Sequence, residues 1–554
     1  MDGINGLSIR EILVRKPFFR TLPMGYGAHG GIYDKWTSDS EPEDNVVYRI
    51  ATQADFLREY YPSSHLINDP KAFPDVVKQD PDSKKWYTQP VTRTAFAFQQ
   101  IIATKQIVHL CGNDIQMELM SKSRNEAKEQ ENVENLAKFR EGWLEKSMDI
   151  RFYESVRSVK ITGDTAFVGF VKDGKFGGKT LSYLNGDTLY PHCNSITGEL
   201  ELFARKYYDY DEDGRKITEW VEVWDDKYIY RAKRSSTETS ALAKIAEKFG
   251  LHGYGLVSKK PHGFSFVPVA YHRCDDGACW GNSQDTIEKY EEAFSYFCEN
   301  NKAFAFPIIY FKGEDVDIHG DLNGSVKSIS MDTESEAGFL QHQDVSTSFN
   351  TELMTLYKLI YEQSFAVQPP ELKSGDLPGV AVKLLFSPAI EKAIQDACAM
   401  QGFLEKMITI FKHGYGYEIN MEATLVELGI NAWIEPYIHQ NVSELTANLA
   451  TAVQNNFLSK QTASERVSMY SKNDEFDRIM REEKKAQEMD LLNELKKQDN
   501  QTENNIEQQE AVAKIQAGEG GQDVNTGGGG GRPNESGRLY DKNGNWPGRN
   551  NWEK

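Results

Sequence analysis

Four side chains of the types that ligate zinc lie close together in the chain: His262, His272, Cys274 and Cys279. Thiolate sulfur and imidazole nitrogen are the usual ligands of protein-bound zinc. The two cysteines stand in CDDGAC, a loose spacing for zinc, and no second well-spaced cysteine pair accompanies them. We therefore expect these four residues to be ordinary loop and strand residues that bind no metal. A metal-dependent hydrolase with its site at these residues is the less favoured alternative.

Two further stretches resemble ligand-binding motifs but have the wrong spacing. DYDEDG, which begins at Asp209, resembles the start of a calcium loop, but Trp220 stands where the bidentate glutamate belongs. GKFGGKT, which begins at Gly174, resembles a phosphate-binding loop, but one residue is missing between its glycines and a strand pattern follows. The signatures G-x-S-x-G and H-E-x-x-H are absent from the sequence. The sequence therefore predicts neither an enzyme nor a cofactor site.

The composition indicates a large, acidic, folded protein. The chain has 554 residues, 39% of them hydrophobic, and a formal net charge of -20 at pH 7. Proteins that bind nucleic acid tightly usually present a basic face to the phosphates, so the negative net charge argues against tight DNA binding. The same charge is compatible with a conduit through which DNA passes. The six cysteines are scattered, which is typical of reduced thiols in the cytoplasm. We expect neither a membrane span nor a secretion signal.

In the first half of the chain, helical patterns give way to alternating ones. Residues 92–120 are mostly helical in pattern, with Gly112 and Asn113 as a break, and residues 123–146 form a charged helix. The side of this second helix that we expect to face the core carries Val133, Leu136, Phe139 and Leu144. From 158 to 234, polar residues alternate with β-branched and aromatic ones, with turn sequences at 172–174 and 211–214. This predicts an antiparallel β region and an α+β fold.

In the second half, two amphipathic helices flank an acidic β segment. The first helix covers 282–300 and the second 346–366, with short β-like pieces over 301–345 between them. The stretch AVQPPELKSGDLPGVAVKLL then follows. Its prolines lack an N–H and its glycines permit unusual dihedrals, so we predict that it reverses the chain.

A longer helix follows this reversal. Ser387 is its predicted N-cap, with Pro388 in the first turn, and the helical pattern reaches His413. Residues 417–438 are predicted to form a strand, a loop and a strand. The end of the chain, with AGEGGQ and TGGGGGRPNESG, has too little apolar surface to order itself, so residues 498–554 are predicted to be a disordered tail.

This order of elements and several short stretches resemble the portal proteins of long-tailed bacteriophages. WGNSQDTIEKYEEAFSYF is similar to the Gly/Ser start of that family's descending helix. SGDLPGVAVKLLF resembles its Ser-Gly-x-Ala-(Ile/Leu)-Lys signature, with an insertion after Gly375. FLSKQTASERV, followed by DEFDRIMREEKK, is similar to the family's Ser-x-x-Thr turn and Glu-rich helix. The resemblance covers most of the chain, chiefly residues 282 to 490.

The resemblance implies an α+β portal fold with a mixed α/β wing, a two-helix stem, a small β clip, a long kinked wing helix and a helical crown. The corresponding ranges are the wing at 1–281, the stem helices at 282–300 and 346–366, the clip at 301–345, a tunnel loop at 367–380, the long wing helix and strands at 381–438, the crown at 439–497 and the tail at 498–554.

The resemblance also implies a structural, non-enzymatic virion protein that is assembled in the host cytoplasm. Copies of the chain would form a ring, expected to be dodecameric, at one capsid vertex. Double-stranded DNA would pass through the ring during packaging and ejection without sequence-specific binding. The expected partners are the packaging motor (terminase), head–tail adaptor, major capsid and scaffold proteins, with no membrane and no cofactor. Another large phage head or scaffold protein is the alternative.

In this family the tunnel loop lines the inner rim of the ring and faces the DNA. Its residues here are Gln368, Pro369, Pro370, Glu371, Lys373, Ser374, Gly375, Asp376, Pro378 and Gly379. Lys373 is the only base among them, and two acidic residues oppose it, so we do not expect strong gripping of phosphates. An ordinary surface linker between packed helices is the alternative interpretation of the same prolines and glycines.

Overall fold

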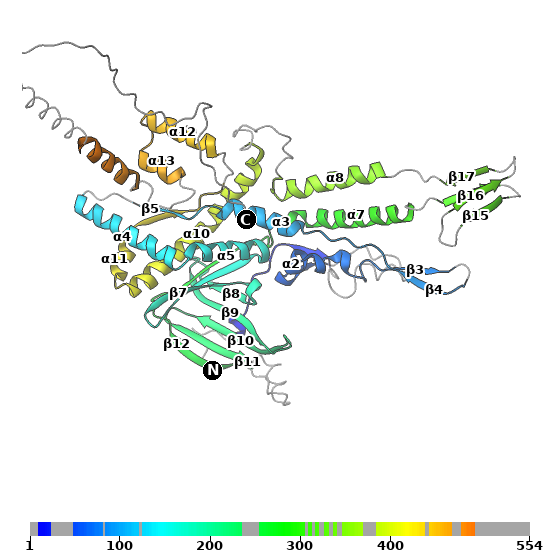
Figure 1. Ribbon diagram of the computed structural model, residues 1–554. Coiled ribbons are helices and arrows are strands. Elements are labelled where there is room, and N and C mark those ends of the chain that lie inside the picture. Colours follow the sequence, from blue (N-terminus) through cyan, green and yellow to red (C-terminus); the bar gives the residue numbers. More distant parts are fainter. Residues whose placement is uncertain are drawn as a thin grey trace, which may run out of the picture. The chain divides into compact units, whose positions relative to one another are not determined.

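The computed structural model describes residues 9–23, 48–80, 83–120, 125–234, 254–304, 308–312, 316–320, 326–331, 336–340, 346–368, 384–437, 442–467 and 478–492. It is a mixed α+β structure, which confirms the predicted fold class (Figure 1). Two compact units divide the chain, one ending at Asn441 and the other beginning at Val442. No helix within these ranges has both the length and the apolar composition needed to cross a bilayer.

The core of the first unit is built around the long helix α10 (Ser387–Glu418). The helices that pack around it are α3 (Phe98–Cys111), α4 (Glu126–Glu145) and α5 (Met148–Thr162). Phe411 of α10 lies in an aromatic cluster, with ring centroids 5.1 Å from Phe139, 5.3 Å from Trp143 and 5.3 Å from Phe176. Each edge-to-face pair of this kind adds about 0.5–1.5 kcal/mol beyond its buried area.

The predicted core side of α4 is half right. Leu136 and Phe139 are buried, whereas Val133 and Leu144 are 52% and 49% exposed. At 100° per residue, the two exposed positions lie about 120–140° from Phe139 around the helix axis. Trp143 takes the place on the core side, with 2% of its surface exposed. The helix and two of its four expected core positions are therefore confirmed, and the other two positions are wrong.

Two antiparallel sheets make up the β region (Figure 1). The three-stranded sheet has the order β13-β6-β7 and the five-stranded sheet has the order β12-β11-β10-β9-β8. The strands are β6 (Asp164–Lys172), β7 (Lys175–Leu181), β8 (Thr188–Cys193), β9 (Leu200–Tyr210), β10 (Lys216–Trp224), β11 (Tyr228–Arg234), β12 (Tyr254–Pro261) and β13 (Val269–Arg273). The predicted turns are confirmed, with Gly174 and Gly214 at φ of 75° and 74°. The first is a hairpin rather than a phosphate-binding loop, and the second is a hairpin rather than a calcium loop.

The boundary between helix and sheet lies later than predicted, because residues 158–162 complete α5. Gly163 ends this helix with a left-handed φ of 81°, and its N–H donates to Val159 O at 2.9 Å. A Cβ added at this position would lie 2.7 Å from a ring carbon of Phe18 and 3.1 Å from Gly277. Both the backbone conformation and the space therefore require glycine.

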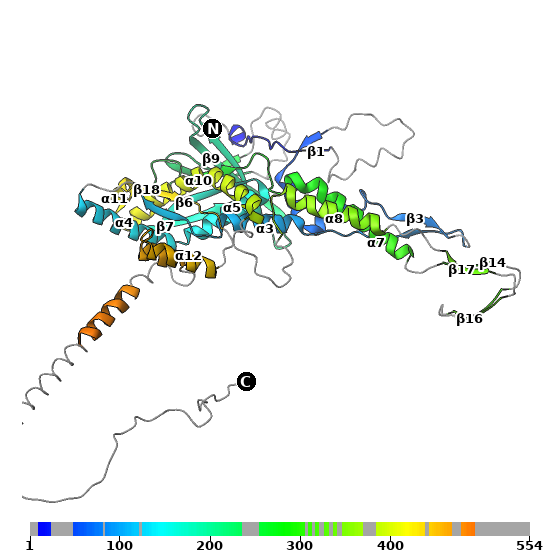
Figure 2. The ribbon, with the colours of Figure 1, turned by 90° about the horizontal axis from the view of Figure 1, so that it is seen from above.

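α7 (Gln284–Phe304) and α8 (Ser346–Gln363) lie side by side, and four short strands join them in the chain (Figures 1 and 2). The strands are β14 (Ile308–Lys312), β15 (Val316–Gly320), β16 (Val326–Met331) and β17 (Glu336–Leu340), paired as β14–β17 and β15–β16. The predicted helix–β–helix order is thus present. α7 continues four residues beyond the predicted end at residue 300.

Residues 417–438 differ from the prediction. α10 continues to Glu418, α11 (Glu422–Glu427) follows, and β18 (Ile430–Trp433) is a strand. β18 pairs with β5 (Gln116–Leu119), a segment predicted to be helical. Tertiary packing shapes this end of the helix: a Cβ at Gly414 would lie 2.1 Å from the Phe176 ring, so the glycine lets α10 approach β7 closely.

Several short elements complete the first unit, and helices make up the second. The short elements are α1 (Ile9–Ile12), β1 (Thr21–Pro23), β2 (Tyr48–Ile50), α2 (Gln53–Tyr60), the 3-10 turns Pro62–Ser64, Leu66–Asn68, Tyr183–Asn185 and Gly281–Ser283, and the hairpin strands β3 (Val76–Gln79) and β4 (Trp86–Gln89). The second unit contains α12 (Val442–Gln454), α13 (Lys460–Val467) and a helix over 478–492. Lys460 pairs with Glu483 at 3.2 Å. The predicted tail at 498–554 lies outside the described residues.

Candidate functional site: the α7–α8 pair and the chain reversal after α8

Aromatic side chains join α7 to α8 along their length. The ring centroids of Tyr290 and Tyr357 are 6.3 Å apart, and those of Phe297 and Phe349 are 5.6 Å apart. As the residue numbers rise on α7 and fall on α8, these pairs show that the two helices run antiparallel. Ile287 on the same stripe is fully buried. The stripe that the sequence predicts on α7 is therefore the surface that packs in the helix pair.

α8 ends in a turn that redirects the chain. Phe365 has a left-handed φ of 55°, and the N–H of Ala366 donates to Tyr361 O at 3.1 Å. This bond is characteristic of a helix C-terminus that satisfies its last carbonyls locally. Gln368 is exposed, and of the ten site residues named in the tunnel loop it is the one that the structure describes. The others, from Pro369 to Gly379, lie outside the described residues.

α3 holds the chain where it leaves α8. Gln106 Nε2 donates to Ser364 O at 2.8 Å, and Lys105 Nζ donates to Val367 O. Burial lowers the pKa of Lys105. Gln106 also accepts a hydrogen bond from Lys160 Nζ at 2.9 Å through Oε1. A single glutamine therefore links the end of α8 to α5.

The same lysine links α5 to the start of α10. Lys160 pairs with Asp396, which also pairs with Lys392 at 3.0 Å. α10 begins at Ser387 itself, so Phe386 takes the N-cap position that we predicted for the serine. Pro388 stands in the first turn, as predicted. Ion pairs and hydrogen bonds thus hold the end of α8 and the start of α10 on α3 and α5.

A cavity lies between α5, α10, the end of α8 and the segment that leads into α7. His272, Cys274 and Cys279 lie on its wall, so the structure brings together three of the four residues considered as zinc ligands. His262 lies elsewhere, with Nε2 at 3.0 Å from Asp225 O. No group of three or more His, Cys, Asp or Glu side chains in the described part of the chain has an arrangement that could hold a metal ion. Burial lowers the pKa of His272 and raises that of Cys279 to about 12.

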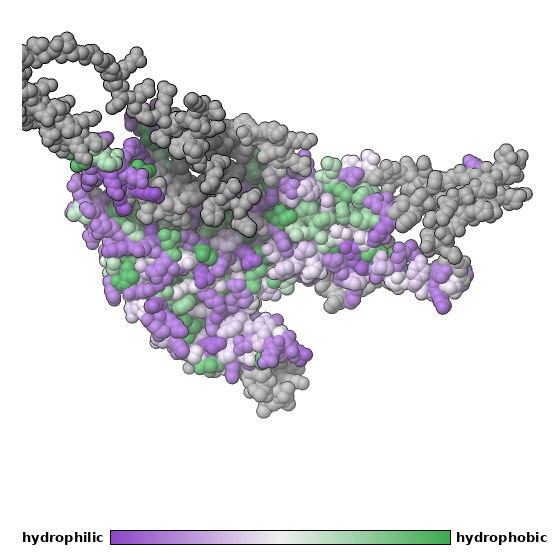
Figure 3. Space-filling model, viewed as in Figure 1, coloured by the Kyte–Doolittle hydropathy of each residue, from purple (hydrophilic) through white to green (hydrophobic). Residues whose placement is uncertain are grey.

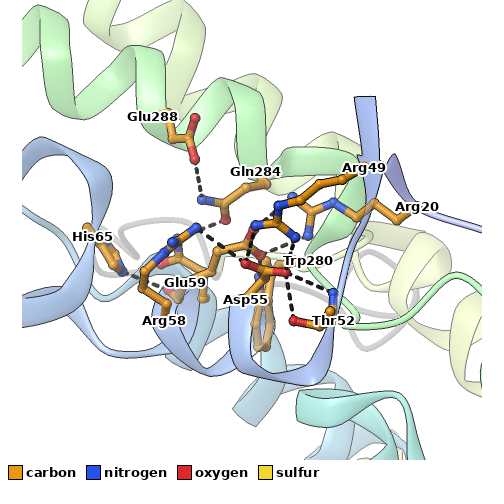
Figure 4. Close-up of polar contacts among 11 residues, drawn as sticks. Arg20, Arg49, Thr52, Asp55, Arg58, Glu59, His65, Trp280, Gln284 and Glu288 are labelled. Carbon is orange, nitrogen blue, oxygen red and sulfur yellow. Dashed lines mark hydrogen bonds and ion pairs between the residues drawn. The ribbon is translucent and has the colours of Figure 1, made fainter. Parts of the chain in front are cut away.

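A buried ionic network lies where α2 meets the start of α7 (Figure 4). Glu59 of α2 is 2% exposed and accepts hydrogen bonds from Arg20 Nη1 and Nη2 at 2.8 and 2.9 Å. Trp280, a fully buried residue just before α7, donates its Nε1–H to the same carboxylate at 3.0 Å. A carboxylate removed from water needs such partners, because an unpaired buried charge is costly. These three side chains therefore fix the base of α7 on α2.

Asp55 lies one turn earlier on α2, within the same network (Figure 4). Burial by itself would raise its pKa, but hydrogen bonds from Arg49 and Thr52 outweigh burial, and the pKa of Asp55 is lowered. Arg49 approaches both carboxylate oxygens at 2.7 Å, and the Thr52 N–H and hydroxyl each donate at 2.8 Å. Asp55 is thus ionised and caps the N-terminus of α2.

A buried histidine extends the network along α7. His65 Nδ1 lies 2.7 Å from Glu291 Oε1, and its Nε2 lies 2.7 Å from Glu59 O. The N–H of Phe96 also donates to Glu291 at 2.8 Å. The sequence analysis did not identify these residues. The sequence feature that could have indicated this network is the spacing of Asp55 and Glu59, two carboxylates four residues apart on a helix that also carries aromatic residues.

Comparison with known proteins identifies the family to which this chain belongs. A family model described as "Phage portal protein, SPP1 Gp6-like" matches residues 44–489. The chain therefore belongs to the SPP1 Gp6-like phage portal protein family. It is a structural protein of the phage virion with a capsid portal role in DNA packaging, and it is not an enzyme. This confirms the family, the virion location and the non-enzymatic role expected from the sequence.

A comparison with solved structures finds a chain of low similarity. A solved structure titled "Virion of native gene transfer agent (GTA) particle" contains a similar chain, with 9% sequence identity and a TM-score of 0.35. The similarity covers 76% of this chain and 93% of that one. No curated protein matches the sequence.

Proposed function

We propose that copies of this chain form a ring, expected to be dodecameric, at one capsid vertex, and that its opening is the channel for double-stranded DNA in packaging and ejection. The family match over residues 44–489 is the observation that carries this proposal. The antiparallel α7–α8 pair suits a stem, the strands β14–β17 suit a clip, and α10 suits the long wing helix. The wing would then comprise 1–281 and 381–438, and the crown 439–497.

The charge of the chain suits a conduit. Each subunit carries a formal charge of -20, and duplex DNA carries about one negative charge per 1.7 Å of its axis. Like charges on the wall and on the duplex oppose the phosphate contacts that would hold DNA in place. The DNA would therefore slide through the ring without sequence-specific binding.

The proposed partners follow from the same architecture. The strands β14–β17 of the clip at 301–345 lie between α7 and α8 in the chain. The clip would contact the packaging motor (terminase) first and the head–tail adaptor afterwards. The major capsid and scaffold proteins would surround the ring during assembly.

Electron microscopy of purified protein tests the ring directly. Negative-stain images should show rings with a central hole, and light scattering should give a mass of about twelve subunits. A protein that remains monomeric at assembly concentrations, or that forms sheets or shells without a central hole, would contradict the proposal.

We further propose that residues 367–380 form the tunnel loop that faces the DNA. Changing both Glu371 and Asp376 to lysine should slow or stall DNA passage, because the loop would then attract phosphates. Glu212→Lys with Asp213→Lys, in the exposed turn between β9 and β10, makes the same change of charge and should leave packaging unchanged. Equal packaging rates in both double variants would refute a DNA-facing loop.

A further inference from the structure

The β3–β4 hairpin has apolar side chains exposed on both of its faces. Val77 and Trp86 lie on one face, 60% and 68% exposed, and Val76 and Tyr87 lie on the other, also exposed. A two-stranded ribbon is marginally stable in water unless it packs against another surface. The hairpin therefore has the character of a docking element.

The segment at residues 92–96, which follows the hairpin, holds it on α7. The hydrogen bonds are Thr92 N to Glu299 Oε1 (2.6 Å), Thr94 N to Ser295 Oγ (3.1 Å) and Phe96 N to Glu291 Oε1 (2.8 Å). Every second residue of this segment thus bonds to every fourth residue of the helix, and two residues of extended chain advance about 6.8 Å, close to the roughly 6 Å of four helix residues. At the hairpin base, Arg93 donates to Asp75 Oδ1 at 2.6 Å and to Phe73 O at 2.7 Å. The hairpin thus projects in a defined direction (Figure 1).

The hairpin and α8 lie on different flanks of α7. Residues 92–96 bind α7 at residues 291, 295 and 299, whereas Tyr290 and Phe297 contact Tyr357 and Phe349 of α8. At 100° per residue, the centres of these two faces are about 150° apart around the helix. One copy of the chain therefore offers its hairpin on one side and α8 on the other. A head-to-tail contact that closes a ring joins two such different flanks.

The two flanks are also chemically complementary. The hairpin with its turn, residues 76–89, carries Lys78, Lys84 and Lys85 against Asp80 and Asp82. α7 and α8 together carry seven carboxylates against three lysines. α8 exposes apolar side chains, including Met354 at 74% and Leu359, and Figure 3 shows hydrophobic surface along this helix. An apolar ribbon with one excess positive charge thus matches an acidic helix pair that has apolar side chains exposed.

We propose that the β3–β4 hairpin of one copy packs against α8 of a neighbouring copy, with Trp86 as the apolar anchor near Met354. The contact rests on the proposed ring and names one of the surfaces that build it. Trp86 is of the residue type that most often dominates an interface when buried.

Cross-linking between differently tagged copies tests this contact. One copy carries Trp86→Cys and the other Met354→Cys, both in a chain whose exposed cysteines are replaced by Cys193→Ser and Cys398→Ser. The copies are co-expressed and treated with a short bismaleimide. Because each copy has one introduced thiol, a product joining the two tags can form only between subunits.

The control replaces Met354→Cys by Ile196→Cys, a residue that is 92% exposed in the turn between β8 and β9. We expect the yield of the two-tag product to be at least about ten times higher with Met354→Cys than with this control. Rings that form but give equal yields would overturn the hairpin contact while leaving the ring intact. Wild-type protein that remains monomeric in light scattering would overturn both the contact and the ring.

A disruption variant gives an independent readout. Val77→Asp with Trp86→Asp places charge at two exposed positions, so the monomer should keep the circular dichroism spectrum of the wild type. The concentration needed for half assembly should rise about tenfold or more, because a buried tryptophan anchor is lost. Unchanged assembly of the double variant would refute the proposal.

Discussion

The buried pair of Glu59 and Arg20 allows a quantitative prediction for the base of α7. Glu59→Gln keeps the size of the side chain and removes its charge. The side chain of Arg20 is 13% exposed and would lose the carboxylate that accepts two of its hydrogen bonds. Removing one partner of a buried ion pair costs about 3–5 kcal/mol, because the remaining charge is uncompensated. The amide partly replaces the acceptor, so we expect about 3 kcal/mol, the lower end of that range.

Native-state hydrogen exchange measures this cost within α2. At about 1.36 kcal/mol per factor of ten, a loss of 3 kcal/mol speeds exchange of the most protected α2 amides by about 150-fold. Adding Arg20→Met to Glu59→Gln should restore most of the protection, since both members of the pair are then neutral. The double variant therefore separates the unpaired charge from any loss of packing.

An exposed pair supplies the control for the same substitution. Lys358 and Glu362 of α8 pair at 3.4 Å with both side chains more than half exposed. A surface pair contributes about 0–1 kcal/mol, so Glu362→Gln should change exchange of α8 amides about fivefold or less. If Glu59→Gln changed exchange of α2 no more than this control changes α8, the pair would not stabilise the base of α7.

Three further predictions follow from the pKa values and the backbone. Asp55 has a lowered pKa, so its stabilising bonds with Arg49 are fully present above the unfolded pKa of 3.8 and are lost as the pH falls through the folded pKa. In urea titrations, Asp55→Asn should therefore destabilise the protein at pH 7, and the difference from the wild type should shrink as the pH falls below 3.8 and through the folded pKa; a difference that stays the same over this range would contradict this. Burial raises the pKa of Cys279 to about 12, so iodoacetamide at pH 8 should modify exposed Cys398 first, as read by peptide mass spectrometry. Equal labelling of both thiols would refute this order. Gly163→Ala should lower the melting temperature, with a loss of about 1–3 kcal/mol from the left-handed backbone and the crowded site; an unchanged melting temperature would argue against both causes.

The order of elements could be predicted because each follows from local patterns. The stripe on α7, the helical period of α8, the alternation of β9 and β10, and the turns at Gly174 and Gly214 all depend on residues close in sequence. The family resemblance depended on that same order, and the family match confirms it.

The errors occurred where distant residues decide the structure. β5 was predicted to be helical because its strand partner, β18, lies about three hundred residues later in the chain. Likewise, the helical pattern was expected to reach His413, but α10 continues to Glu418, and the missing side chain of Gly414 admits the Phe176 ring of β7. Both places depend on packing that has no local signature.

The sequence by itself determined the α+β class, the helix–β–helix order and the portal family, since amphipathic periods and turn residues act over short distances. Only the tertiary structure decided which polar residues are buried together. Glu59 meets Arg20 and Trp280 from segments far apart in the chain, and burial is what makes that pairing energetically necessary. The docking character of the β3–β4 hairpin was likewise visible only once both of its faces were found exposed.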